Sequence, residues 1–130
     1  EPLAAGIGRG KFYRLEVWRL GMQLVKNVYS ITKNFPREEQ FSLTSQLRRA
    51  AISVPLNIAE GSAKRTKRDF AQSIRIALGS LMEVTTCLEI AREQNYIAET
   101  TLSEIKSNIE TLYFKLIGLD KSLTRNTENI

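Results

Sequence analysis

A single period runs through this sequence, and it is the period of the α-helix. No segment alternates apolar and polar residues with period two, as a half-buried strand would. One heptad seam runs from Leu102 to Leu123. Another is an unbroken alternation of fours and threes, made by Phe70, Ile74, Ala77, Leu81, Val84, Leu88 and Ala91. Seams of this kind pack helices against one another, so the pattern predicts an all-α fold.

The residues between the apolar stretches predict where four helices begin and end. The first helix is expected over 15–35, because Pro36 cannot continue it, and the second over about 42–60, ended by Gly61 and Ser62. The third is expected to open at Thr66, with Asp69 three residues on as in a capping box, and to stop at Asn95. The fourth is expected to begin at Thr100 or Thr101. Short polar connections between four such helices predict an antiparallel four-helix bundle over residues 12–124.

The two ends of the chain are expected to lie outside this bundle. Residues 1–11 are predicted to be a disordered arm, or residues foreign to the natural chain, and residues 125–130 a frayed tail. At 130 residues the chain is expected to form one domain. No apolar run approaches the length of a membrane-spanning helix, and the single cysteine excludes an intrachain disulfide, so we expect a cytoplasmic protein without a membrane partner.

The second helix carries apolar residues on two sides, which is more than one bundle core needs. Its outer stripe consists of Ile52, Leu56 and Ala59, nearly opposite the core stripe, and the first helix is also two-striped. An apolar face of this kind usually marks an interface. We therefore expect a homo-oligomer, unless the N-terminal arm or the 36–41 loop folds over the stripe.

Nothing in the sequence favours catalysis, a metal or a cofactor. The chain has no histidine, which removes the commonest general base and transition-metal ligand. Cys87 lies in the middle of the third helix and is expected to be a buried structural thiol. Glu83, Glu89 and Glu93 lack the histidines that accompany carboxylates in di-iron bundles. The chain is expected not to be an enzyme.

A proline and two polar residues interrupt the second helix near its end. Pro55 should kink the helix and leave the carbonyl of Ala51 without its usual donor. Asn57 flanks the core stripe, where a polar side chain most often fixes helix register by hydrogen bonding. Glu60 is expected to pair with a nearby Lys or Arg. We assign both Asn57 and Glu60 structural roles.

The positive charge of the chain is concentrated between residues 44 and 75. The whole chain carries a formal net charge of +5, and this stretch alone has seven Lys or Arg against Glu60 and Asp69. The seven candidate nucleic-acid-binding residues are Arg48, Arg49, Lys64, Arg65, Lys67, Arg68 and Arg75. Such a surface attracts the phosphates of RNA or DNA, without a preference for sequence. The alternative is a charged face that only meets solvent, on an oligomeric scaffold that binds proteins.

Four blocks of the sequence occur together in one known family. They are Leu15-Glu16-Val17-Trp18, Gln46-Leu47-Arg48-Arg49-Ala50, Asn57-Ile58-Ala59-Glu60-Gly61 and Ile76-Ala77-Leu78-Gly79-Ser80 with Glu83. In order over about residues 12–123, they resemble the four-helix-bundle proteins encoded in intervening sequences of bacterial 23S rRNA genes.

The resemblance implies a small helical bundle that assembles as a ring, typically a homopentamer, and a family without a settled biochemical activity. More distantly, the chain is similar to the accessory variability determinant of diversity-generating retroelements, a basic pentamer that works with reverse transcriptase and nucleic acid. Together the two likenesses imply a reverse-transcriptase-like or ribosomal partner.

Overall fold

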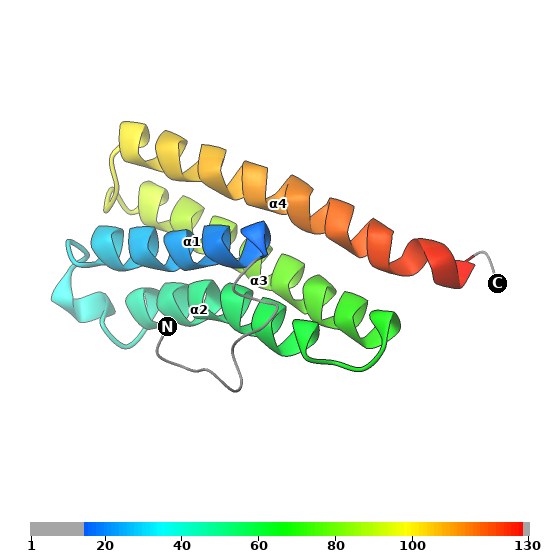
Figure 1. Cartoon of the computed structure of the whole chain (residues 1–130). Coiled ribbons are helices and arrows are strands. Elements are labelled where there is room, and N and C mark those ends of the chain that lie inside the picture. The colour runs from blue at the N-terminus through cyan, green and yellow to red at the C-terminus, as the bar shows by residue number, and fades with distance from the viewer. Residues whose placement is uncertain (1–14, 129–130) are drawn as a thin grey trace.

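A computed structural model of the chain describes residues 15–128, with side chains described as far as residue 125. Over this range the protein consists of four α-helices and one short 3-10 helix, with no strand. In order they are α1 (Glu16–Thr32), η3 (Arg37–Glu39), α2 (Leu43–Ser62), α3 (Lys67–Glu93) and α4 (Glu99–Glu128). Consecutive α-helices run in opposite directions and lie side by side, which confirms the predicted four-helix arrangement (Figure 1). The predicted arm over residues 1–11 lies outside the described residues.

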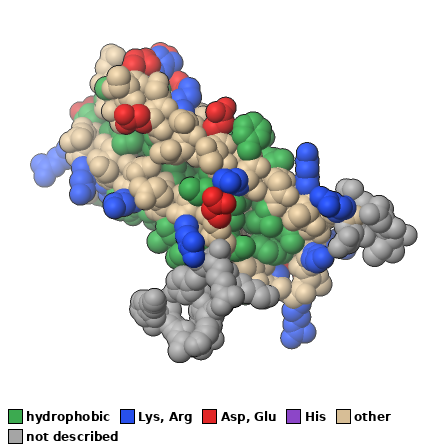
Figure 2. Space-filling model, turned by 45° about the horizontal axis from the view of Figure 1, so that its top comes forward, with side chains coloured by type: hydrophobic (Ala, Val, Ile, Leu, Met, Phe, Trp, Pro, Cys, Tyr) green, Lys and Arg blue, Asp and Glu red, His purple; other side chains and the backbone are tan. Residues whose placement is uncertain are grey.

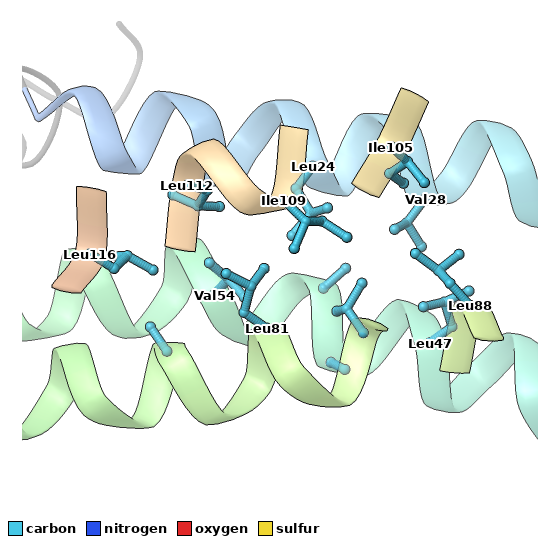
Figure 3. Packing of buried hydrophobic residues seen from close by; sticks show 14 of the residues in the cluster. Leu24, Val28, Leu47, Val54, Leu81, Leu88, Ile105, Ile109, Leu112 and Leu116 are labelled. Atoms are coloured by element: carbon cyan, nitrogen blue, oxygen red, sulfur yellow. The ribbon is translucent and has the colours of Figure 1, made fainter. Parts of the chain in front are cut away.

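The core contains the residues that the helical period predicts (Figure 3). Leu47, Val54 and Ile58 of α2 are fully buried, as are Ile74, Leu81 and Leu88 of α3. The seam of α4 is buried from Leu102 to Leu116 and again at Leu123. Each such side chain stabilises the fold by roughly 1.5–3 kcal/mol relative to an exposed position. Among the described helices none is long and apolar enough to cross a membrane.

The first helix ends earlier than the apolar stripe predicted. α1 stops at Thr32, and the amides of Asn34 and Phe35 then bond to the carbonyls of Ile31 and Thr32 in a tight turn. Pro36 disfavours helical backbone in the residue before it, which explains the early end. Phe35 is still buried, because the turn points its ring toward Tyr96 in the connection between α3 and α4.

The second helix ends at Ser62, one of the two residues predicted to end it, but Gly61 does not terminate the helix. It lies inside α2 and is buried, and a Cβ at this position would come within 2.6 Å of Cβ of Ser73 on α3. The missing side chain therefore allows α2 and α3 to approach closely just before the loop that joins them.

The start of α3 is as predicted, and the start of α4 is not. Thr66 Oγ1 accepts a hydrogen bond from the Asp69 amide at 3.0 Å, as a capping residue should. After α3 ends at Glu93, Asn95 has a positive φ of 64°, a conformation that asparagine tolerates better than most residues. α4 begins at Glu99, before either expected threonine, and its backbone helix continues to Glu128, past the expected end of its seam.

Helices α1 and α2 meet at Gly21 and Pro55. A Cβ added to Gly21 would lie 3.2 Å from Cβ of Pro55, so the two helices touch almost backbone to backbone. Pro55 is buried inside α2, as the sequence placed it. The proline ring that costs α2 a hydrogen bond thus also supplies the surface on which α1 rests.

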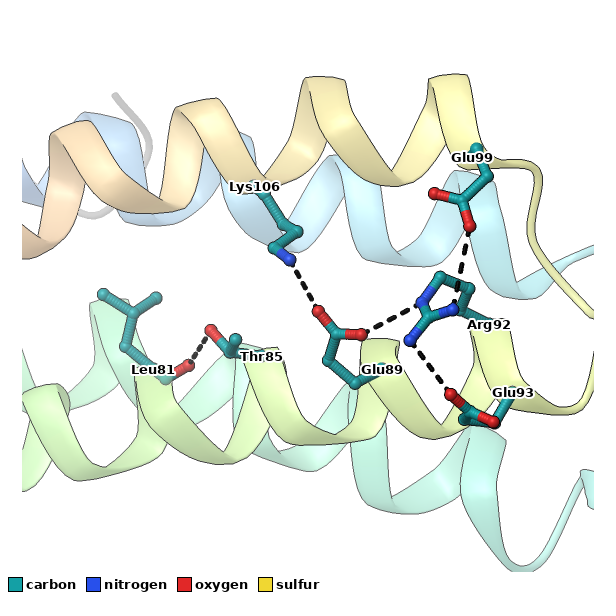
Figure 4. Close-up of polar contacts among 7 residues, drawn as sticks. All are labelled: Leu81, Thr85, Glu89, Arg92, Glu93, Glu99 and Lys106. Atoms are coloured by element: carbon teal, nitrogen blue, oxygen red, sulfur yellow. Dashed lines mark hydrogen bonds and ion pairs between the residues drawn. The ribbon is translucent and has the colours of Figure 1, made fainter.

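A network of ion pairs joins α3 and α4 near the connection between them (Figure 4). Arg92 contacts Glu89 at 3.1 Å, Glu93 at 3.0 Å and Glu99 at 3.7 Å. Lys106 of α4 completes the network at 2.6 Å from Glu89. Hydrogen bonds from Lys106 and Arg92 lower the pKa of Glu89, and the Glu89 carboxylate raises the pKa of Arg92.

Candidate nucleic-acid interface

Four of the seven predicted cations gather around the loop between α2 and α3. Lys64, Arg65, Lys67 and Arg68 are all exposed, and none forms an ion pair with another described residue. A shallow hollow at the start of α3 is lined by Thr66, Arg68, Asp69 and Gln72. We call Lys64, Arg65, Lys67 and Arg68 the basic loop. Its cations are available to an anionic partner without breaking an existing contact.

Arg75, by contrast, already has a partner. Its Nη2 lies 3.1 Å from Oδ1 of Asp120 on α4, and its Nε donates to Oδ2 at 3.2 Å. The Asp120 carboxylate offsets part of the positive charge of Arg75, whose side chain is 50% exposed. Arg75 therefore ties α3 to α4 beside the basic loop and is not a free cation.

Arg48 and Arg49 lie in the other half of the molecule. They lie about fourteen residues before the end of α2 at Ser62, which corresponds to roughly 20 Å of helix. Arg48 is half-buried: its Nε donates to Thr32 Oγ1 at 2.8 Å, and its guanidinium lies 4.4 Å from the centre of the Tyr29 ring. Arg49 is exposed and borders a hollow with Phe41 and Ile90. The seven cations therefore do not form one surface, because Arg48 packs on α1 and Arg49 is too distant.

Sequence analysis missed two cations that the fold brings to the basic loop. Lys121 and Arg125 of α4 are exposed, and they follow Asp120, whose ion pair with Arg75 places this part of α4 beside α3. Figure 2 shows Lys and Arg side chains at both ends of the bundle, and at the end that carries the α2–α3 loop no acidic side chain is visible among them on this face. The one signal for them in the sequence was the predicted antiparallel order of the helices, which brings the end of the fourth helix beside the start of the third.

The outer stripe of α2 is exposed to solvent as predicted. Leu56 is 50% exposed, Ile52 is 40% exposed and Ala59 is half-buried. On α1, which packs beside α2, Met22 and Tyr29 are also exposed. We call these five residues the α1–α2 apolar face. No described residue covers Ile52 or Leu56, although the 36–41 segment is described.

Asn57 forms hydrogen bonds of the kind that its position suggested. Its Nδ2 donates to the carbonyl of Ser53 at 2.8 Å and to the Ser53 hydroxyl at 3.0 Å. Ser53 in turn shares a hydrogen bond of 2.7 Å with Ser80 of α3. Asn57 thereby supports a polar contact between α2 and α3. Glu60 is exposed, and the ion pair expected for it is not found among the described residues.

Cys87 is buried, as expected of a structural thiol. Burial, with a smaller contribution from the charge of Glu83, raises the pKa of its thiol above the ordinary value. At neutral pH the group is therefore a thiol and a poor nucleophile. The described residues include no group of three or more acidic or cysteine side chains placed to hold a metal ion.

The sequence matches the family model described as 23S rRNA-intervening sequence protein over residues 13–118. The chain belongs to this family. The match contains α1, η3, α2 and α3 entire and most of α4, so the basic loop and the α1–α2 apolar face are both inside it. It confirms the resemblance found in the sequence.

One solved structure shows the fold of a related bundle. It is a protein of unknown function from the S23 ribosomal protein family of Bacteroides thetaiotaomicron, with 22% sequence identity and a TM-score of 0.73. The alignment covers 81% of this chain and 98% of the Bacteroides chain. No curated protein matches the chain. At this identity the likeness concerns the four-helix fold alone.

Proposed function

We propose that this protein is a non-enzymatic, homo-oligomeric four-helix bundle of the cytoplasm that binds the phosphate backbone of nucleic acid through its basic loop. The observation that carries the proposal is the state of the four loop cations. Lys64, Arg65, Lys67 and Arg68 are exposed without an ion pair to a described residue, whereas Arg48 and Arg75 of the same predicted set are engaged within the fold.

Binding at this site should depend on charge and not on base sequence. The cations sit on a loop and a first helical turn, and they suit phosphates, which carry no sequence information directly. For a duplex, each phosphate that a cation neutralises makes the negative slope of log affinity against log salt steeper by about 0.9. The family name makes ribosomal RNA the first probe to use, and a ribosomal or reverse-transcriptase-like protein could share the complex.

The test compares two variants that lose the same charge at different places. The loop variant changes Lys64, Arg65, Lys67 and Arg68 to Ser. The control variant changes Lys26, Lys33, Arg37 and Arg49 to Ser, which are exposed cations away from the loop. The loop variant should keep its helical circular dichroism and reduce the salt slope of RNA binding by up to about 3.6 units, and the control should change it much less. Equal effects of the two variants would mean that the basic loop influences binding only through the net charge of the protein and is not the binding site.

We further propose that the α1–α2 apolar face is the contact between subunits of a ring, and the family resemblance makes a pentamer the expected number of subunits. Half-exposed Ile52 and Leu56 next to exposed Met22 and Tyr29 make an apolar area that a monomer would leave in water. Leu56→Lys should dissociate the assembly, measured by light scattering at micromolar concentration, and Glu110→Lys on α4 is the control. A monomeric unmodified protein would contradict the proposal.

An oligomeric scaffold that binds only proteins is the second candidate. The same apolar face favours it, because an exposed stripe can hold a partner chain as well as a copy of this one. The scaffold predicts that the loop variant binds every partner as the unmodified protein does.

A further inference from the structure

The basic loop is one part of a wider cationic surface that α4 completes. α3 and α4 are antiparallel, and the Arg75–Asp120 ion pair shows which of their turns lie side by side at the basic end. Counting five residues along each helix from this ion pair, Arg125 of α4 is level with Phe70 of α3. Arg125 thus lies beside the first turns of α3, which carry Lys67 and Arg68, and Lys121 lies one turn before it.

Lys121 and Arg125 are free to contact a ligand. Both are exposed, and neither forms an ion pair with another described residue. With the basic loop they make six cations on three chain segments: the loop, the start of α3 and the last turns of α4. Neighbouring packed helices lie about 8–10 Å apart, so these cations are spread across a width and not along one line.

The same surface lacks the features with which proteins hold single strands. Single-strand sites combine a basic groove with exposed aromatic rings on which bases stack. In residues 60–75 and 120–125 the one aromatic side chain is Phe70, which is half-buried against the core. The described aromatic residues that are exposed, Tyr29, Phe41 and Phe114, lie on other parts of the molecule.

We infer that the basic end binds double-stranded nucleic acid in preference to single strands, and that Lys121 and Arg125 extend the contact made by the basic loop. This inference rests on the proposed function. A duplex presents closely spaced phosphates on a stiff, broad surface, which suits cations held by packed helices, and its bases need no stacking partner. A single strand would gain only the weaker electrostatic part of its usual binding free energy at this surface.

The alternative role of Lys121 and Arg125 is local. Cations near the C-terminus of a helix interact favourably with its dipole, and this would stabilise α4 without any ligand. That role predicts that removing both charges lowers the melting temperature and leaves nucleic-acid binding as it was. The two roles therefore differ in a measurable way.

The experiment measures binding of a 20-base-pair RNA duplex, and of each of its two strands alone, by fluorescence anisotropy at several salt concentrations. The proteins are the unmodified chain, the double variant Lys121→Ser with Arg125→Ser, and a control double variant Lys26→Ser with Lys33→Ser. The unmodified chain should bind the duplex on the order of tenfold more tightly than either strand. The α4 variant should reduce the duplex salt slope by up to about 1.8 units, and the control should not.

Three other results would contradict the inference in whole or in part. Strands that bind as tightly as the duplex, in a way that the loop variant weakens, would overturn this inference and leave the proposed function standing. If the α4 variant has the same duplex salt slope as the control, Lys121 and Arg125 are not part of the binding surface. No binding of duplex or strand by the unmodified chain would overturn both this inference and the proposed function.

Discussion

The two ends of the α3–α4 pair use their charges in different ways. Near the α3–α4 connection, Arg92 and Lys106 are matched by Glu89, Glu93 and Glu99 at contact distances. At the other end only Arg75 is matched, by Asp120, while the basic loop, Lys121 and Arg125 have no carboxylate partner among the described residues. Paired charges hold two helices together. Unpaired cations repel one another, and their grouping at one end is understandable when an anionic partner brings the compensating charge.

The largest expected effect concerns the helix joint next to the basic loop. Gly61→Ala would place a Cβ within 2.6 Å of Ser73 and 2.9 Å of the Phe70 ring, which forces α2 and α3 apart. The free energy of unfolding should fall by about 1–3 kcal/mol, measured by urea denaturation. Gly79→Ala is the matched control, since its Cβ would meet nothing within 4 Å and alanine is the better helix former. It should raise stability by roughly 0.5–1 kcal/mol. A tolerated Gly61→Ala would show that packing does not set the geometry of the basic end.

A smaller effect is expected when the paired end loses its central cation. Arg92→Ala removes three contacts at once and leaves the carboxylates of Glu89, Glu93 and Glu99 close to one another. The melting temperature should fall, by less than Gly61→Ala lowers it, because the pairs are partly exposed and screened by solvent. Nucleic-acid affinity should not change. Reduced binding with the fold intact would contradict the division of roles between the two ends.

Removing the one anion that is paired at the basic end should change nucleic-acid binding, which Arg92→Ala should leave unchanged. Asp120→Asn frees Arg75 and adds one positive charge to the surface. The salt slope of nucleic-acid binding should steepen by up to about 0.9 units, while α3–α4 packing loses an ion pair. Binding titrations at several salt concentrations measure the first effect and thermal melts the second. A loss of affinity would mean that Arg75 positions the surface and that its own charge is not needed there.

The smallest expected effect is a pH dependence at the paired end. Glu89 has a pKa below its ordinary value of 4.5, because Lys106 and Arg92 donate hydrogen bonds to its carboxylate. A lowered pKa adds stability that is fully present above the ordinary pKa and is lost as pH falls through the folded-state pKa. The stability advantage of the unmodified protein over Glu89→Gln should therefore be seen at pH 7 and vanish in acid. A difference between the unmodified protein and Glu89→Gln that stays constant with pH would contradict the pairing.

The sequence predicted the elements that depend on neighbouring residues and not the contacts between distant ones. Thr66 with Asp69 gave the start of α3, and the spacing of Phe70 to Ala91 gave its buried side, because both signals lie within a few turns. Arg75 and Asp120 are 45 residues apart, so nothing local distinguished Arg75 from the free cations beside it. Lys121 and Arg125 were hidden in the same way. Gly61 had two roles open to it, helix end or close packing, and only the position of Ser73 on α3 decides between them.

The contact between Gly21 and Pro55 has a consequence for the outside of the molecule. Two helices that touch almost backbone to backbone cannot slide past one another. This contact therefore sets the register of the two helices, that is, which turn of α1 lies beside which turn of α2. Met22 follows Gly21, and Leu56 follows Pro55, and both are exposed. The outward residues of the two helices therefore come level in one continuous face. A slip of one turn would leave two staggered stripes that no flat partner could cover together.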